Sequence, residues 1–94
     1  MKRDQVERRL LDVHGRLVRA RQELAVAEEQ LDVFLETAEE TRIRSLVSET
    51  PLADRDWQDA QRHADAMIRA RDSASERDAE LERAQDELLG KLVV

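Results

Sequence analysis

Mostly apolar residues recur along residues 6–45 with alternating spacings of four and three positions. They are Val6, Leu10, Val13, Leu17, Ala20, Leu24, Ala27, Leu31, Phe34, Ala38, Thr41 and Ser45. A period of 3.5 residues places these side chains on one narrow face, here called the seam, of a single long helix. A face this narrow packs against one partner helix rather than against a broad globular core. The pattern therefore predicts a long helix that pairs with another helix.

A second helix is predicted directly after the only proline. Pro51 disfavours helical geometry at the residue before it, so Thr50 is expected to cap the new helix and Pro51 to be its first residue. Gly90 suits the left-handed position that ends a helix. Apolar residues recur every seven positions, at Ala60, Met67, Ala74, Leu81 and Leu88, and are flanked by Trp57, Ala64, Ile68, Ala70, Ala84 and Leu89. This pattern is weaker than the first, because one flank is interrupted by Arg71, Asp78 and Gln85.

These patterns predict an all-α fold in which two long helices form an antiparallel coiled-coil hairpin. We expect a single hairpin over residues 1–94, with helices over about 3–48 and 51–89, a turn at about 49–51 and a short apolar tail over 90–94. So short a connection makes the two helices antiparallel neighbours. A lone pair of helices buries one seam only, so we expect dimerisation into a four-helix bundle or docking on a larger protein.

The distribution of charge also favours the antiparallel arrangement. Residues 1–21 contain seven Lys or Arg against three Asp or Glu, and they would lie beside the acidic last third of the chain. The acidic middle of the first helix would lie beside Arg55, Arg62, Arg69 and Arg71. Exposed ion pairs contribute about 0.2–1 kcal/mol each, so we expect them to select orientation and register rather than to supply stability.

The composition argues against several classes of protein. Aromatic residues make up 2% and charged residues 40% of the 94 positions, which leaves few large side chains for an ordinary globular core. The absence of cysteine excludes disulfides, thiolate zinc sites and cysteine nucleophiles. Neither a signal peptide nor a stretch of about 18 apolar residues is present, so we expect a cytoplasmic protein with no membrane partner. A net charge of −6 argues against direct nucleic-acid binding.

No group of residues predicts a catalytic or metal site. His14 and His63 are isolated and lack a second ligand at helical spacing. The two glycines, Gly15 and Gly90, form no phosphate-binding loop. A pair of helices also provides no concave pocket that excludes water from a substrate. We therefore expect no enzymatic activity, no cofactor and no metal.

Two surfaces are candidates for binding a partner. The first is the tip of the hairpin, which contains Asp54, Arg55, Asp56 and Trp57. Trp is enriched at interaction hot spots, and Trp57 is expected to present one edge to a partner while its ring packs against Ile43, Leu46 or Val47. The second is an apolar strip beside the seam of the first helix, at Leu11, Val18, Ala25, Val26 and Leu35. Of these, the candidate self-association face consists of Leu11, Val18 and Leu35.

The tip also resembles a known family. Ala53-Asp54-Arg55 and Gln58 stand where the second helix begins. This arrangement resembles the factors that insert a coiled-coil hairpin into the secondary channel of bacterial RNA polymerase, the DksA and Gre types. The DksA tip has the pattern Asp-x-x-Asp-x-Ala, and Asp54 matches its second acid, whereas Pro51 stands at the first acid position and Asp56 at the Ala position. The resemblance implies that Asp54 and Asp56 act near the catalytic metal of the polymerase.

The resemblance is confined to this short segment and the hairpin architecture. The Gre type has an acid and a nearby acid before an aromatic residue, which Asp54, Asp56 and Trp57 loosely resemble with a shorter spacing. The zinc-finger cysteines and the second globular module of these factors are missing. We expect a non-enzymatic hairpin that acts as a protein–protein interaction adaptor or regulator through its tip and flanks. Two alternatives stay open: a transcription regulator that inserts its acidic tip into RNA polymerase, and a self-associating structural coiled coil.

Overall fold

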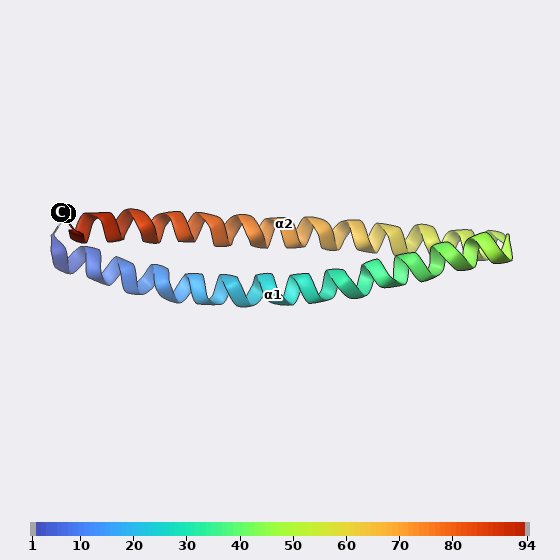
Figure 1. The fold of residues 1–94 in the computed structure, drawn as a ribbon, viewed down its shortest axis with the longest axis horizontal. Helices are drawn as coiled ribbons and strands as arrows, with labels where there is room; N and C mark the ends of the chain where they lie inside the picture. Colours follow the sequence, from blue (N-terminus) through green and yellow to red (C-terminus); the bar gives the residue numbers. More distant parts are fainter. Residues whose placement is uncertain (1, 94) are drawn as a thin grey trace. The chain divides into compact units, whose positions relative to one another are not determined.

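The computed structural model describes residues 2–93 and contains two helices (Figure 1). The helix α1 spans Arg3–Ser48, and α2 spans Pro51–Val93. Residues 49 and 50 connect them, so α2 begins immediately after the bend. This arrangement confirms the expected all-α fold with two long helices in an antiparallel hairpin.

Contacts within the chain divide it into two units, each of which contains a segment of both helices. Unit 1 consists of Met1–Ala25 and Ser73–Val94, and unit 2 consists of Val26–Asp72. Unit 2 therefore contains the turn, whereas unit 1 joins the N-terminal part of α1 to the C-terminal part of α2. Each unit is a pair of antiparallel helical segments.

Burial along α1 follows the 4-3 spacing of the sequence. All twelve predicted seam positions are buried or half-buried, and Val6 and Leu17 are only 1% exposed. Apart from these positions, Gly15 and Arg42 are the half-buried residues of α1. Because the buried set repeats every 3.5 residues, α1 meets a single neighbour along one face.

The seam of α2 has the same 4-3 spacing as that of α1, but it contains more polar residues than the sequence pattern predicted. Its buried and half-buried positions include Ala53, Trp57, Ala60, Ala64, Met67, Arg71, Ala74, Asp78, Leu81, Gln85, Leu88 and Leu92. Ala70 and Leu89, which were expected to flank the seam, are exposed instead. Arg71, Asp78 and Gln85 are half-buried on the seam instead, because they continue the seven-residue repeat of Trp57 and Ala64. The α2 seam therefore combines small apolar side chains with three polar ones.

Alanines allow the two helices to pack closely in unit 2. Ala38 of α1 and Ala60 and Ala64 of α2 form a buried cluster, against which Phe34 packs. The rings of His63 and Phe34 are arranged edge to face, with 6.0 Å between ring centroids and 82° between ring planes. His63 thus has a packing role beside the seam.

The turn follows local backbone rules. The N–H of Glu49 donates to the carbonyl oxygen of Ser45 at 3.0 Å, and Glu49 has a left-handed φ of 50°, which ends α1. The N–H of Ala53 donates to Oγ1 of Thr50 at 3.2 Å. Thr50 is therefore the N-cap that the sequence predicted, with Pro51 as the first helical residue.

The C-terminal boundary of α2 differs from the prediction. The helix continues through Gly90 to Val93, and Gly90 does not have a positive φ. The extension places Leu92 at the next seam position, seven residues after Gln85, where it is half-buried. Lys91 in the last turn also interacts favourably with the helix dipole. These gains outweigh the preference of glycine for a helix end; of the predicted tail, Val94 lies outside the described residues.

Two ion pairs cross between the helices in unit 1. Nε of Arg21 lies 3.6 Å from Oδ1 of Asp78, and Nη1 of Arg77 donates to Oε2 of Glu23 at 2.6 Å. The first pair is of the kind expected between the basic start of α1 and the acidic end of α2. Both pairs fit one antiparallel alignment of the two helical segments.

The arginines expected beside the acidic middle of α1 make different contacts. Arg62 pairs with Asp59, and Arg71 pairs with Asp72 at 2.7 Å, both within α2. An acid one or three residues away along the same helix is reached with less loss of side-chain freedom than one on the other helix. Within residues 26–72, the expected cross-helix ion pairs of these arginines are not formed.

Candidate interaction surfaces

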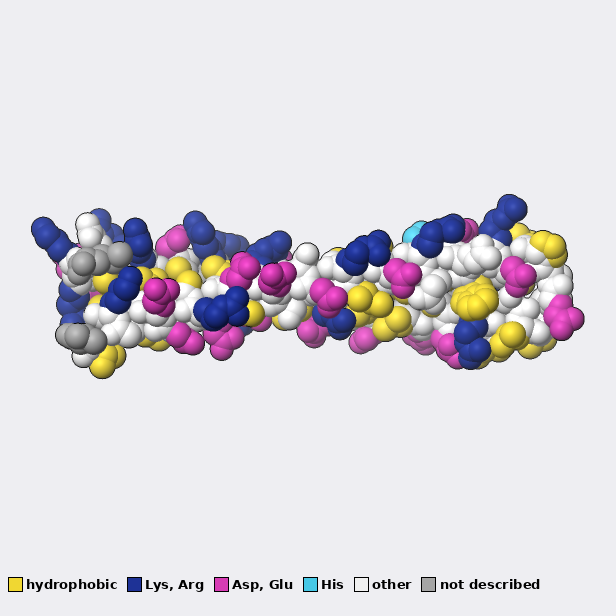
Figure 2. All heavy atoms as spheres, turned by 90° about the horizontal axis from the view of Figure 1, so that it is seen from above, with side chains coloured by type: hydrophobic (Ala, Val, Ile, Leu, Met, Phe, Trp, Pro, Cys, Tyr) yellow, Lys and Arg dark blue, Asp and Glu magenta, His cyan; other side chains and the backbone are white. Residues whose placement is uncertain are grey.

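The turn of unit 2 exposes a group of large aliphatic side chains. Ile43 is 50% exposed, Leu46 63%, Val47 79% and Leu52 68%; these four residues are called the tip surface. Figure 2 shows hydrophobic side chains in yellow at the end of the molecule that contains the turn in Figure 1. Leu46 and Val47 directly follow the seam residue Ser45, so they point to the outside of the coiled coil, where polar residues are usual.

The predicted tip residues differ in how far their side chains contact the rest of the hairpin. Asp54, Arg55 and Asp56 are exposed, and Trp57 is half-buried. The hydroxyl of Ser45 donates a hydrogen bond to Oδ1 of Asp54. This bond connects the last turn of α1 to the first turn of α2, so Asp54 contributes to the turn itself. Asp56 is exposed two residues farther along α2.

Trp57 is half-buried, while Ile43, Leu46 and Val47, against which it was expected to pack, stay exposed by half or more. It occupies a seam position between Ala53 and Ala60, whereas Leu46 and Val47 are 63% and 79% exposed. The physical reason is the helical spacing. The indole occupies the seam of α2, which faces α1. Leu46 and Val47 come one and two positions after Ser45, the last seam residue of α1, so they point away from α2. These aliphatic side chains are therefore available to solvent.

Sequence reasoning missed the tip surface as a whole, although a signal was present. The same heptad spacing that identifies the seam also identifies the outward positions. Apolar residues at outward positions are the informative exceptions, and Leu46, Val47 and Leu52 are three such residues within one turn of the bend. The expectation had concentrated on the charged residues of the tip.

Unit 1 exposes a second apolar surface. Leu11 is 73% exposed and Val18 41%, while Ala25 is also exposed. An adjoining groove of about 380 Å³ is lined by Glu7, Leu10, Leu11, His14, Gln85 and Leu89. Leu35, the third member of the predicted self-association face, belongs to unit 2 and is 42% exposed.

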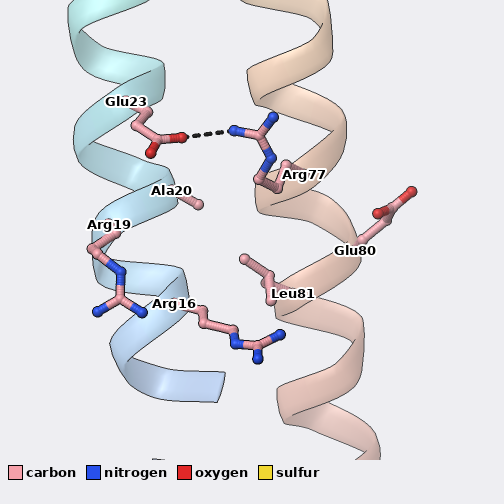
Figure 3. A pocket seen from close by; sticks show the side chains of 7 residues that line it. All are labelled: Arg16, Arg19, Ala20, Glu23, Arg77, Glu80 and Leu81. Atoms are coloured by element: carbon pink, nitrogen blue, oxygen red, sulfur yellow. Dashed lines mark hydrogen bonds and ion pairs between the residues drawn. The ribbon is translucent and has the colours of Figure 1, made fainter. Parts of the chain in front are cut away.

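A charged groove of about 460 Å³ occurs elsewhere on unit 1 (Figure 3). Ala20 and Leu81 point toward each other between the helices, and the side chain of Arg16 extends from α1 toward α2. Glu23 and Arg77 form an ion pair across the groove, while Glu80 points away from it. Arg16 also pairs with Asp12 at 3.2 Å. The groove is therefore a site of internal charge pairing.

The ion pair of Glu39 and Arg42 on α1 shifts the pKa of both side chains. Nε and Nη2 of Arg42 donate to the two carboxylate oxygens of Glu39 at 3.0 and 2.7 Å. These hydrogen bonds lower the pKa of Glu39 and raise the pKa of Arg42, with the charge–charge attraction adding to both shifts. The pair stabilises one turn of helix on the solvent side.

The described residues provide little for other kinds of chemistry. Within residues 2–93, no group of three or more His, Cys, Asp or Glu is placed to hold a metal ion. Neither α1 nor α2, over the same range, contains a segment apolar and long enough to cross a membrane. Comparison of the chain with protein-family models, with curated proteins and with solved structures gave no match.

Proposed function

We propose that this hairpin acts without enzymatic activity as a protein–protein interaction module, and that its tip surface binds the partner. The observation that supports this is the exposure, by half or more, of four large aliphatic side chains around one turn. Apolar residues at outward coiled-coil positions have no role in the packing of the hairpin itself. Covering them with a partner gains about 25 cal/mol for each Å² of apolar surface removed from water.

The surroundings of the tip surface suit a protein partner. Arg44, Glu49, Arg55 and Asp56 are exposed residues close in sequence to the four aliphatic ones. An apolar centre with a charged rim is the usual anatomy of a protein interface. The expected partner presents an apolar socket flanked by charges of both signs. We place this contact in the cytoplasm.

A second candidate function is transcription regulation through the secondary channel of RNA polymerase. The exposed carboxylate of Asp56, close to the bend, is the observation that favours it. Asp54 is less suited to such a role, because its carboxylate accepts the Ser45 hydroxyl hydrogen bond. Binding of purified bacterial RNA polymerase to the wild-type chain tests this candidate. Binding that Asp56→Asn weakens is the expected result, and the absence of binding would rule the candidate out.

The tip proposal is tested with a pair of matched variants. In the tip variant, Leu46, Val47 and Leu52 are replaced by Ser. In the control, Val33→Ser changes a valine of α1 that is 60% exposed and lies on neither candidate surface. Circular dichroism should show unchanged helicity in both variants, because none of these residues is on a seam.

The readout is the set of proteins that each variant captures from the cells in which the chain is made, quantified against wild type. We expect the tip variant to lose a partner that wild type and the control both retain. Equal capture by all three chains would contradict a role for the tip surface. Equal loss in both variants would also contradict it, since general surface hydrophobicity would then explain the binding.

A further inference from the structure

The α1 segment of unit 1 has two adjacent apolar lines. The seam line contains Leu10, Leu17 and Leu24, and the second line, one residue later, contains Leu11, Val18 and Ala25. The seam line is buried or half-buried by α2, whereas the second line is exposed. A helix that pairs with a single neighbour requires only the seam, and a helix within a four-helix bundle requires a wider apolar sector.

The α2 segment of unit 1 continues this apolar surface. Leu89 is 43% exposed and lines the same groove as Leu10 and Leu11. Ala79 directly follows the seam residue Asp78, as Leu89 follows Leu88, and is half-buried. Leu11, Val18, Ala25, Ala79 and Leu89 together are called the Leu11 face.

The charges on the Leu11 face are separated between the helices. On α1, His14 and Arg21 lie between the apolar residues, three positions after Leu11 and Val18. On α2, Glu82 and Asp86 lie seven and three positions before Leu89, and both are exposed. Within the span of the face the α1 edge thus has a cation at Arg21, with Glu7 beyond its end, whereas the α2 edge is acidic. Arg21 keeps 55% of its side chain exposed although it is paired with Asp78.

This separation makes the face complementary to a copy of itself. If α1 of one chain lies antiparallel to α2 of another, Arg21 and His14 approach Glu82 and Asp86 on both sides of a twofold axis that runs along the helices. If instead α1 lies on α1, the basic residues meet each other and so do the acidic ones. Like charges facing each other disfavour the second arrangement.

The exposed area also fits a dimer. The chain exposes 7029 Å². A folded monomer of 10.9 kDa exposes about 5,600 Å² by the usual scaling of surface with mass, so the excess is about 1,400 Å². A stable interface buries about 800 Å² on each partner, which is less than this excess of the whole chain.

We propose that the Leu11 face binds a second copy of this chain, with α1 of each chain antiparallel to α2 of the other. The contact forms a four-helix bundle from two copies of unit 1. Leu11 of one chain then lies beside Leu89 of its partner. The inference is independent of the tip surface, whose residues belong to unit 2.

Sedimentation equilibrium of the full chain at micromolar concentration tests the association. We expect twice the mass of the 10.9 kDa chain. The variant Leu11→Glu with Val18→Glu should sediment as a monomer with unchanged helicity, because neither residue is on the seam. The control Val33→Glu with Val47→Glu changes two exposed valines of unit 2 and should remain dimeric. A monomeric wild type, or a dimer that the Leu11 and Val18 variant retains, would overturn the proposal.

The natural absence of cysteine allows the orientation to be tested separately. One chain with Leu11→Cys and one with Leu89→Cys are mixed, equilibrated and oxidised, and the products are digested with trypsin so that the masses of the disulfide-linked peptides identify which cysteines are joined. We expect the mixed disulfide, which joins the two different variants, to form in preference to either symmetric one. A preference for the symmetric disulfide between two Leu11→Cys chains would overturn the antiparallel α1–α2 contact. In the sedimentation experiment, the tip variant with Leu46, Val47 and Leu52 replaced by Ser should dimerise as wild type does.

Discussion

Asp78 lies on the seam of α2 with Oδ1 buried, and its nearest cation is Nε of Arg21 at 3.6 Å. This distance allows charge attraction but is too long for a hydrogen bond, so Oδ1 has no hydrogen-bond partner within the described residues. The side chain of Asp78 is 19% exposed, whereas that of Arg21 is 55% exposed. The seam therefore contains a carboxylate that is desolvated without full compensation.

Replacing this carboxylate by an apolar side chain is expected to stabilise the hairpin. Asp78→Leu removes the desolvation cost and extends the apolar seam between Ala74 and Leu81, while Arg21 remains solvated. We expect the free energy of unfolding, measured by urea denaturation, to rise by about 1–2 kcal/mol. Asp78→Asn is the control, because it keeps a polar group of the same size and should give no comparable gain. A less stable Leu variant would show that the ion pair stabilises the native seam.

The Ser45–Asp54 hydrogen bond is expected to couple the two helices at the turn. Asp54→Ala leaves the buried Ser45 hydroxyl without this acceptor and removes an acid from the first turn of α2. We expect a loss of about 1 kcal/mol, and a double-mutant cycle with Ser45→Ala should give a coupling of similar size. Asp56→Ala, at an exposed position nearby, should change stability by less than about 0.5 kcal/mol. Additive effects of the Ser45 and Asp54 changes would contradict the bond.

Glu49 is expected to strain the turn slightly. Its φ of 50° is left-handed, and a residue with a Cβ adopts this geometry at a cost of about 1–2 kcal/mol. Glycine removes this cost but loses more chain entropy on folding, so Glu49→Gly should stabilise the hairpin by about 0.5–1 kcal/mol. Thermal unfolding followed by circular dichroism measures the effect. Ser48→Gly, one residue earlier and within α1, should instead destabilise.

The two glycines provide a test of the helix boundaries. A Cβ at Gly15 would meet Nη1 of Arg19 at 3.7 Å, an ordinary contact, and a Cβ at Gly90 would meet nothing within 4 Å. Gly15→Ala should stabilise α1 by up to about 1 kcal/mol, and Gly90→Ala should stabilise α2 by less, because it is near the helix end. Hydrogen exchange of the last turn is the second measurement. A destabilising Gly90→Ala would mean that α2 ends at Gly90 in a left-handed conformation.

The Glu39–Arg42 pair predicts a small pH effect. The folded pKa of Glu39 lies below its ordinary value of 4.5, so the pair stabilises above that value and the stabilisation is lost as the pH falls through the folded pKa. Arg42→Gln removes the donor and should move the pKa of Glu39 back toward its ordinary value, as followed by NMR of the side-chain carboxyl carbon. Arg44→Gln, which leaves the pair intact, should not. An unchanged Glu39 pKa in the Arg42 variant would contradict the assignment.

Most of the fold was readable from periodicity. The 4-3 spacing from Val6 to Ser45 identified every seam residue of α1, because a heptad repeat specifies both the helix and its buried face. Thr50 and Pro51 identified the start of α2 through local backbone preferences. The α2 seam was harder to identify, since Asp78 and its two polar equivalents obscure the repeat. The predicted end at Gly90 was wrong, because burial of Leu92 on the seam outweighs a local glycine preference.

The candidate surfaces were less predictable than the fold. Leu11 and Val18 could be recognised as a second apolar line, because their positions follow from the helix alone. The outward positions of Leu46 and Val47 follow from the same spacing, whereas the packing of Trp57 across the turn does not, because it depends on the other helix. The engagement of Asp54 by Ser45 is likewise a contact between helices.

The sequence by itself determined the two helices up to Gly90, the face that α1 buries and where the chain turns, because these properties depend on spacings of seven residues or fewer. Only the tertiary structure decided how Trp57 packs across the turn, which acid bonds across it, and that Asp78 is buried beside Arg21 without a hydrogen bond. Those properties depend on the register between two helices. Register is set by packing and charge summed along the whole seam rather than by any local pattern.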